Sequence, residues 1–142
     1  MSQSATELSN VCTLQRSKLA HQRILIVEDE MLIALALIDV VAALGASWTA
    51  TSRVTKAVAL VAAEPFDAAI LDLNLAGEPA DAVVEALRDR DIPFVIATGY
   101  GAEAIAEKYR DLPRLSKPYT PGQVETALLD ALSAKTSRVR SA

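Results

Sequence analysis

Short apolar runs alternate with longer segments of helical character along most of this chain. The runs are too short and too uniformly apolar for surface helices, and they are typical of strands buried in a parallel sheet. Four such runs predict strands at 23–27, 68–72, 93–98 and 114–116, and a further strand is expected at 47–51. The other segments predict helices at 31–44, 54–63, 80–90, 102–109 and 121–133. Five such strand–helix units predict an α/β fold with helices on both faces of a parallel sheet.

The expected first helix, 31–44, is apolar on nearly all sides and carries a single charged residue. Its inward stripe is expected to be Ile33, Leu37, Val40, Val41 and Leu44. Leu35, Ile38 and Ala42 lie on the other side, where a surface helix normally shows polar residues. We therefore expect a partner to cover this face: a second copy of the chain in a homodimer, segment 1–22, or another protein. A tolerated apolar surface is the alternative.

Composition suggests one domain with two polar ends. The chain has 142 residues, of which 51% are hydrophobic, and this length can bury a substantial core. We expect an N-terminal extension at 1–22, loose or partly helical, one domain at 23–133 and a C-terminal tail at 134–142.

Charge and cysteine content exclude several classes of partner. The net charge of −4 disfavours broad binding to nucleic acid or to anionic membranes. No apolar run approaches the roughly 18 residues of a membrane span, and 1–22 lacks the apolar core of a signal peptide. The single Cys12 cannot form an internal disulfide, which suits a reducing compartment. We expect a soluble, cytoplasmic protein.

Polar residues of complementary chemistry stand at the ends of four apolar runs. Glu28 and Asp29 follow the first run, Asp72 ends another, Thr98 ends the next, and Lys117 follows the last. The carboxyl ends of parallel strands share one edge, where ligands bind. Carboxylates at that edge suit a hard cation, whereas a hydroxyl and an ammonium group can hold an anion.

These landmarks, in this order, resemble the receiver domain of two-component response regulators. The motifs are Ile24–Glu30, Ile70–Leu75, Ala97–Gly99 and Lys117-Pro118. The resemblance covers about residues 23–133. It implies a flavodoxin-like (βα)5 fold, which is a doubly wound parallel sheet of strand order 2-1-3-4-5.

The resemblance also implies a phosphoacceptor site. Asp72 would accept a phosphoryl group from the phosphohistidine of a kinase or phosphotransfer protein. Thr98 and Lys117 would each contact a phosphoryl oxygen. Pro118 is a candidate for a cis peptide bond after Lys117, because such bonds are rare outside X-Pro.

A magnesium ion is the implied cofactor of that site. Asp29, Asp72 and the main-chain carbonyl of Asn74 would ligate Mg²⁺, and Glu28 would act through a bound water. The ion would reduce the repulsion between the Asp72 carboxylate and the incoming phosphoryl group.

Two departures from the common receiver concern the readout of the signal. Many receivers carry Tyr or Phe three residues before the lysine, where this chain has Arg114. Residues 96–100 resemble the Phe-Ala-Thr-Gly motif of a subgroup nicknamed FAT GUY, which commonly works with kinases of the HWE and HisKA2 classes. We expect the signal to be read through segment 99–112, with Tyr100 or Arg114 repositioned.

The favoured function is a stand-alone receiver that switches its affinity for a downstream protein, or that drains phosphoryl groups from a shared kinase. It would be a signalling protein with, at most, slow self-dephosphorylation. One alternative is a haloacid-dehalogenase-type phosphatase, but this class expects a second Asp two residues after its nucleophile, and Met31 stands two residues after Asp29. The other alternative is a degenerate receiver that only binds partners.

Overall fold

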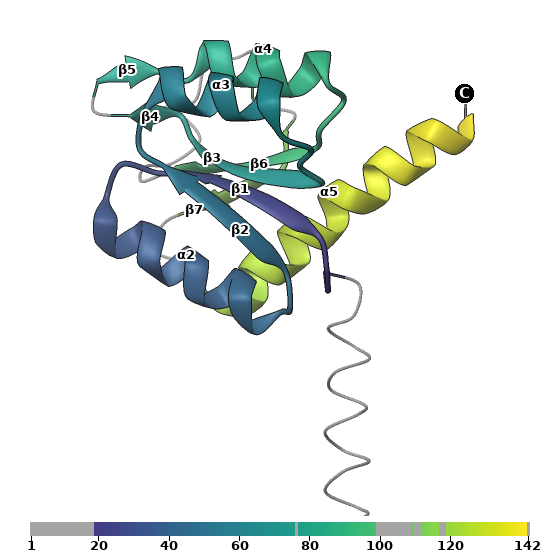
Figure 1. Cartoon of the computed structure of the whole chain (residues 1–142). Coiled ribbons are helices and arrows are strands. Elements are labelled where there is room, and N and C mark those ends of the chain that lie inside the picture. Colours follow the sequence, from purple (N-terminus) through teal and green to yellow (C-terminus); the bar gives the residue numbers. More distant parts are fainter. Residues whose placement is uncertain (1–18, 76, 99–108, 110–111, 117–118, 142) are drawn as a thin grey trace, which may run out of the picture.

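The parallel sheet has five strands and sits at the centre of the fold (Figure 1). The computed structural model describes residues 19–75, 77–98, 109, 112–116 and 119–141. The strands are β1 (Arg23–Val27), β2 (Ser47–Thr51), β3 (Ala68–Asp72), β6 (Phe94–Thr98) and β7 (Arg114–Ser116). Their spatial order is β2-β1-β3-β6-β7. Numbered along the chain within this sheet, that order is 2-1-3-4-5, so the predicted flavodoxin-like topology is confirmed.

Two layers of helices cover the two faces of the sheet (Figure 1). Helices α2 (Met31–Ala43) and α5 (Pro121–Ser141) pack together on one face. Helices α3 (Val54–Ala63) and α4 (Asp81–Asp89) pack together on the other. The sheet is therefore doubly wound, as the alternation of strands and helices predicted.

Alternation along each strand divides the core into two clusters. In β1, Leu25 and Val27 join the cluster under α3 and α4, whereas Ile24 and Ile26 join the cluster under α2 and α5. All four side chains are at most 1% exposed. A strand buried on both faces needs an unbroken apolar sequence, which is why these runs could be recognised without a structure.

The structure differs from the sequence-based expectation in the connection after β3 and at the end of α5. The segment after β3 forms a small antiparallel hairpin of β4 (Asn74–Leu75) and β5 (Glu78–Pro79), where we expected only a loop. Gly77 adopts a positive φ of 86° at its turn, a conformation that glycine tolerates best.

Helix α5 also continues to Ser141, although we expected it to end at residue 133 and to be followed by a tail. Residues 134–141 contain neither Gly nor Pro to end a helix. They also include Lys135, Arg138 and Arg140, and basic residues are favourable near a helix C-terminus. Figure 1 shows this last part of α5 extending beyond the sheet.

The expected helix at 102–109 lies outside the described residues, apart from Tyr109.

Candidate functional site

Three carboxylates converge at the carboxyl edge of the sheet. One oxygen from each of Glu28, Asp29 and Asp72 can be chosen so that all three lie within 4.8 Å of one another. The convergence follows from the register, because β1 and β3 are parallel neighbours in which Val27 pairs with Leu71. The residues that follow this pair, Glu28 and Asp72, therefore stand side by side at the edge of the sheet.

Backbone contacts fix the first of these acids. The Glu28 N–H donates to the carbonyl of Thr51 over 3.1 Å, which extends the β1–β2 pairing by one residue. The Glu28 Oε2 accepts a hydrogen bond from the Glu30 N–H at 3.1 Å. The carboxylate is therefore held in the loop between β1 and α2 before any ligand arrives.

Burial makes this grouping of like charges costly. Glu28 is 4% exposed and Asp72 is 7% exposed, while Asp29 is half-buried. Charges brought together away from water are costly unless they are paired or hydrogen-bonded. A bound divalent cation would supply such a partner. Three carboxylate oxygens at this spacing are the donor set that Mg²⁺ or Ca²⁺ prefers, so the residues present fit a hard cation.

The remaining predicted phosphoryl contacts belong to the next two strands. Asp72 pairs with Ala97, so Thr98 stands one residue further along the neighbouring strand. Thr98 in turn pairs with Ser116, the residue before Lys117. Lys117 itself lies outside the described residues, as do Pro118 and Tyr100.

Asn74, predicted to offer a carbonyl to the metal, and Arg114, predicted to take part in the readout, occupy separate places. Asn74 opens β4 directly after the acid-bearing end of β3 and pairs with Pro79. Arg114 begins β7, two residues before the end of that strand, and is exposed. It lines an open hollow with residues of α5, including Gln123 and Asp130, and does not belong to the acidic cluster.

Two tyrosines near this edge were missed by the sequence analysis. The Tyr119 hydroxyl is buried, and no hydrogen-bond partner for it is found among the described residues. The buried Tyr109 donates a hydrogen bond from its hydroxyl to Asp81 Oδ1 in the first turn of α4. A signal for Tyr119 existed in the sequence, since it follows Lys117-Pro118 directly, but its environment depends on tertiary packing.

Comparisons with solved structures agree with this geometry. SdrG from Sphingomonas melonis Fr1 is 45% identical, with a TM-score of 0.72, and the match covers 80% of this chain and 97% of SdrG. The response regulator REC domain of PhyR from Erythrobacter litoralis is 31% identical, with a TM-score of 0.71, over 80% of this chain and 92% of that domain. The chain belongs to the receiver domains of response regulators.

A more distant receiver domain is that of the sensor histidine kinase PA1611 from Pseudomonas aeruginosa PAO1. It is 21% identical, with a TM-score of 0.72, over 80% of this chain and 99% of that domain, and its structure has a magnesium ion coordinated in the active-site cleft. At this identity the likeness shows the fold alone. No family model matches the chain, and no curated protein matches it.

Helix α2 of this receiver presents an apolar outer face. Met31 is 76% exposed, Leu32 is 83% exposed and Leu35 is 50% exposed. Ala42 is also exposed, but Ile38, which we expected on the outer side, is half-buried and packs against the core cluster beneath α2. The exposed apolar surface therefore lies mainly over the first turns of the helix. Among the described residues, no helix combines the length and apolar character that a membrane span requires.

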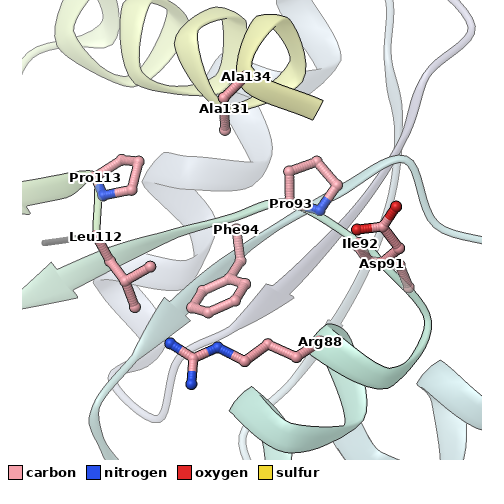
Figure 2. A pocket seen from close by; sticks show the side chains of 9 residues that line it. All are labelled: Arg88, Asp91, Ile92, Pro93, Phe94, Leu112, Pro113, Ala131 and Ala134. Carbon is pink, nitrogen blue, oxygen red and sulfur yellow. The ribbon is translucent and has the colours of Figure 1, made fainter. Parts of the chain in front are cut away.

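The receiver also has a hollow of about 340 Å³ at the amino edge of the sheet, away from the acids. Figure 2 shows the Arg88 side chain extending from α4 toward Phe94, with Ala131 and Ala134 of α5 on the other side. Its lining residues are Arg88, Asp91, Ile92, Pro93, Phe94, Leu112, Pro113, Ala131 and Ala134. The lining is mostly apolar and lacks the converging carboxylates of the opposite edge.

Proposed function

We propose that this receiver accepts a phosphoryl group on Asp72, in the presence of Mg²⁺, from the phosphohistidine of a histidine kinase or phosphotransfer protein. The observation that carries the proposal is the convergence of Glu28, Asp29 and Asp72 at the carboxyl edge, with carboxylate oxygens within 4.8 Å of one another. Membership of the receiver family supports assigning phosphoryl transfer to this cluster.

The transfer needs a nucleophile and a way to reduce charge repulsion. An Asp72 carboxylate oxygen attacks phosphorus, an O–P bond forms, and the P–N bond breaks with its electron pair returning to the histidine nitrogen. A bound Mg²⁺ would withdraw negative charge from the reacting oxygens. Asp29, Asp72 and the Asn74 carbonyl are the proposed ligands, and Glu28 is proposed to act through water.

Two further side chains complete the proposed site. The Thr98 hydroxyl is proposed to donate to one phosphoryl oxygen and the Lys117 ammonium to another. The register of β3, β6 and β7 supports this assignment, because it brings Thr98 and Ser116 level with each other beside Asp72. The phosphoryl group then changes the charge and shape of this edge, which is the basis of a switch.

Phosphorylation would change the surface of the protein at this edge. We therefore propose a signalling protein that acts on protein partners or drains phosphoryl groups from a shared kinase. The motif at 96–100 favours a kinase of the HWE or HisKA2 class. The apolar face of α2, with Met31, Leu32 and Leu35, is the proposed partner surface, either for a kinase or for a second copy of this chain. Segment 99–112 and Arg114 are the proposed readout.

Beryllofluoride and acetyl phosphate test the acceptor directly. The relative SdrG has a structure in a BeF3-activated conformation, 44% identical with a TM-score of 0.69 over 80% of this chain and 98% of that one. With acetyl phosphate and Mg²⁺, the intact wild-type protein should gain one phosphoryl group by mass spectrometry, and Asp72→Asn should gain none. Absence of modification in the wild type would favour a degenerate receiver, and turnover of phosphate esters would favour a phosphatase.

A further inference from the structure

The phenol of Tyr119 is a polar group to which the proposed phosphoryl transfer assigns no role. Its hydroxyl oxygen is buried, and the described residues provide it with no hydrogen-bond partner. The ring packs against the core cluster between the sheet and helices α2 and α5. Buried hydroxyl groups in native proteins nearly always have a protein or water partner. A buried hydroxyl without a protein partner therefore indicates a site for a water or a ligand.

The surroundings of this hydroxyl are acidic. Burial raises the pKa of Tyr119 well above its usual value, and the negative charges of Glu28, Asp72 and Glu30 raise it further, in that order. Among these carboxylates, Glu28 contributes most to the raised pKa of Tyr119. It stays protonated at neutral pH and is available as a hydrogen-bond donor.

A water is the natural link between these two groups. The phenol can donate a hydrogen bond to the water oxygen, and the water can donate a hydrogen bond to the carboxylate. Each donor in this chain then has an acceptor. A direct hydrogen bond from the phenol to Glu28 is not formed, yet the two groups interact electrostatically. An intervening water accounts for both observations.

We propose that Tyr119 is a positioning residue of the cation site, whose hydroxyl holds Glu28 in place through a bridging water. The proposal rests on the proposed function, because Glu28 matters here as an outer-sphere partner of Mg²⁺. Groups that hydrogen-bond to a metal's ligands commonly change metal affinity by about 10- to 100-fold when removed, and we expect the lower end of this range because Tyr119 acts one step further out. Tyr119 would therefore tune cation binding without contacting the cation or the phosphoryl group.

The test compares Tyr119→Phe with Tyr109→Phe in the full chain. Both variants convert a phenol to a benzene ring, but only the Tyr109 hydroxyl has a described partner, Asp81. Mg²⁺ affinity is measured by calorimetric titration, and the thermal midpoint is measured without Mg²⁺. Tyr119→Phe should weaken Mg²⁺ binding about 10-fold and leave the midpoint within about 2 °C of wild type. Tyr109→Phe should lower the midpoint by about 3–6 °C and leave the Mg²⁺ affinity within about twofold.

A spectroscopic readout locates the effect. The chain has three tyrosines, so protein labelled with 3-fluorotyrosine gives three ¹⁹F signals, and the signal lost in Tyr119→Phe identifies this residue. That signal should shift when Mg²⁺ alone is added.

The alternative outcomes separate the two proposals. If the wild type binds Mg²⁺ and beryllofluoride but Tyr119→Phe binds Mg²⁺ equally well, the role of Tyr119 is refuted and the proposed function stands. Weaker beryllofluoride binding with unchanged Mg²⁺ affinity would place the hydroxyl on the phosphoryl group and overturn the water bridge. A midpoint loss as large as that of Tyr109→Phe would indicate a structural role instead. A wild type that binds neither probe would overturn both proposals.

Discussion

The two edges of the central sheet arrange their charges in opposite ways. At the amino edge, the Arg23 guanidinium donates to Glu64 at 2.6 Å, and the Arg23 N–H donates to Asp67 Oδ2 at 2.7 Å. At the carboxyl edge, Glu28, Asp29 and Asp72 bring three carboxylates within 4.8 Å of one another. Among the described residues, the first edge pairs a basic side chain with acids, whereas the second brings three acids together.

This difference separates a structural arrangement from the proposed site. The Arg23–Glu64 pair is more than one-third exposed on both sides and joins β1 to the end of α3, so it adds a modest amount to stability. Glu28 and Asp72 at the other edge are buried, and they lie close enough to Asp29 for the three acids to hold one cation. Buried acids gathered in this way are more typical of binding sites than of scaffolds.

The largest expected effect is the loss of phosphoryl acceptance at the carboxyl edge. Asp72→Asn should reduce labelling by a kinase or by acetyl phosphate by at least about 10³-fold, because the nucleophilic oxygen is removed. A phosphate-affinity gel measures the labelled fraction over time. The matched amino-edge variant, Arg23→Met, should be labelled at the wild-type rate. Equal loss in both variants would show that the two edges do not differ in function.

Metal addition should produce the next largest effect. At a Mg²⁺ concentration 100 times the dissociation constant, wild-type stability should rise by about 2.7 kcal/mol through mass action. Urea unfolding with Mg²⁺ or with a chelator measures the difference. Asp29→Asn should lose most of this gain because it removes a proposed ligand, while Arg23→Met should retain it. A Mg²⁺ response that survives Asp29→Asn would place the ion elsewhere.

The hydrogen bond between Tyr109 and Asp81 sharpens the comparison, because it lies near the carboxyl edge and has a structural partner. Tyr109→Phe should lower the free energy of unfolding by about 1–2 kcal/mol, since Tyr109 is buried and Asp81 loses a donor. Urea unfolding without Mg²⁺ measures this loss. Asp81→Asn keeps a carbonyl oxygen as acceptor and should lose less. Equal stability of wild type and Tyr109→Phe would contradict the expectation.

The smallest expected effect belongs to the amino edge. Arg23→Met should lower the free energy of unfolding by about 0.5–1 kcal/mol, because it removes an exposed ion pair and a contact with the Phe66 ring at 5.5 Å. Glu64→Gln should lose part of the same amount. The double variant should lose less than the sum of the two, since both changes remove one shared interaction. Additive losses would mean that the pair does not contribute to stability.

Strands β1 and β3 were predictable because strands buried on both faces require nearly uninterrupted apolar sequence. The ranges expected at 23–27, 47–51, 68–72 and 114–116 agree with β1, β2, β3 and β7. The hairpin of β4 and β5 was not predicted, because two-residue strands have too few positions to show a period. The end of α5 was wrong because the polar residues after 133 were interpreted as a tail, although none of them stops a helix.

One feature around the candidate site was predicted correctly from the sequence, and another was not. The convergence of Glu28, Asp29 and Asp72 followed from strand-end positions alone, because parallel neighbours end at one edge. Ile38 was placed on the outer side of its helix by periodicity, but packing around α2 leaves it half-buried. Periodicity gives the direction in which a residue points from the helix axis. It cannot show how much of the helix surface the neighbouring elements cover.

The sequence by itself determined the parallel sheet and the edge at which the acids meet, because those depend on local patterns and on strand–helix alternation. The strand order was implied by the resemblance to receiver domains. Only the tertiary structure decided that Tyr119 buries a hydroxyl without a described partner and that Tyr109 bonds to Asp81. Both features depend on which side chains from distant elements enclose a single polar atom. No periodic pattern in the sequence shows which side chains surround a given atom. Such contacts are therefore known only from the packed structure.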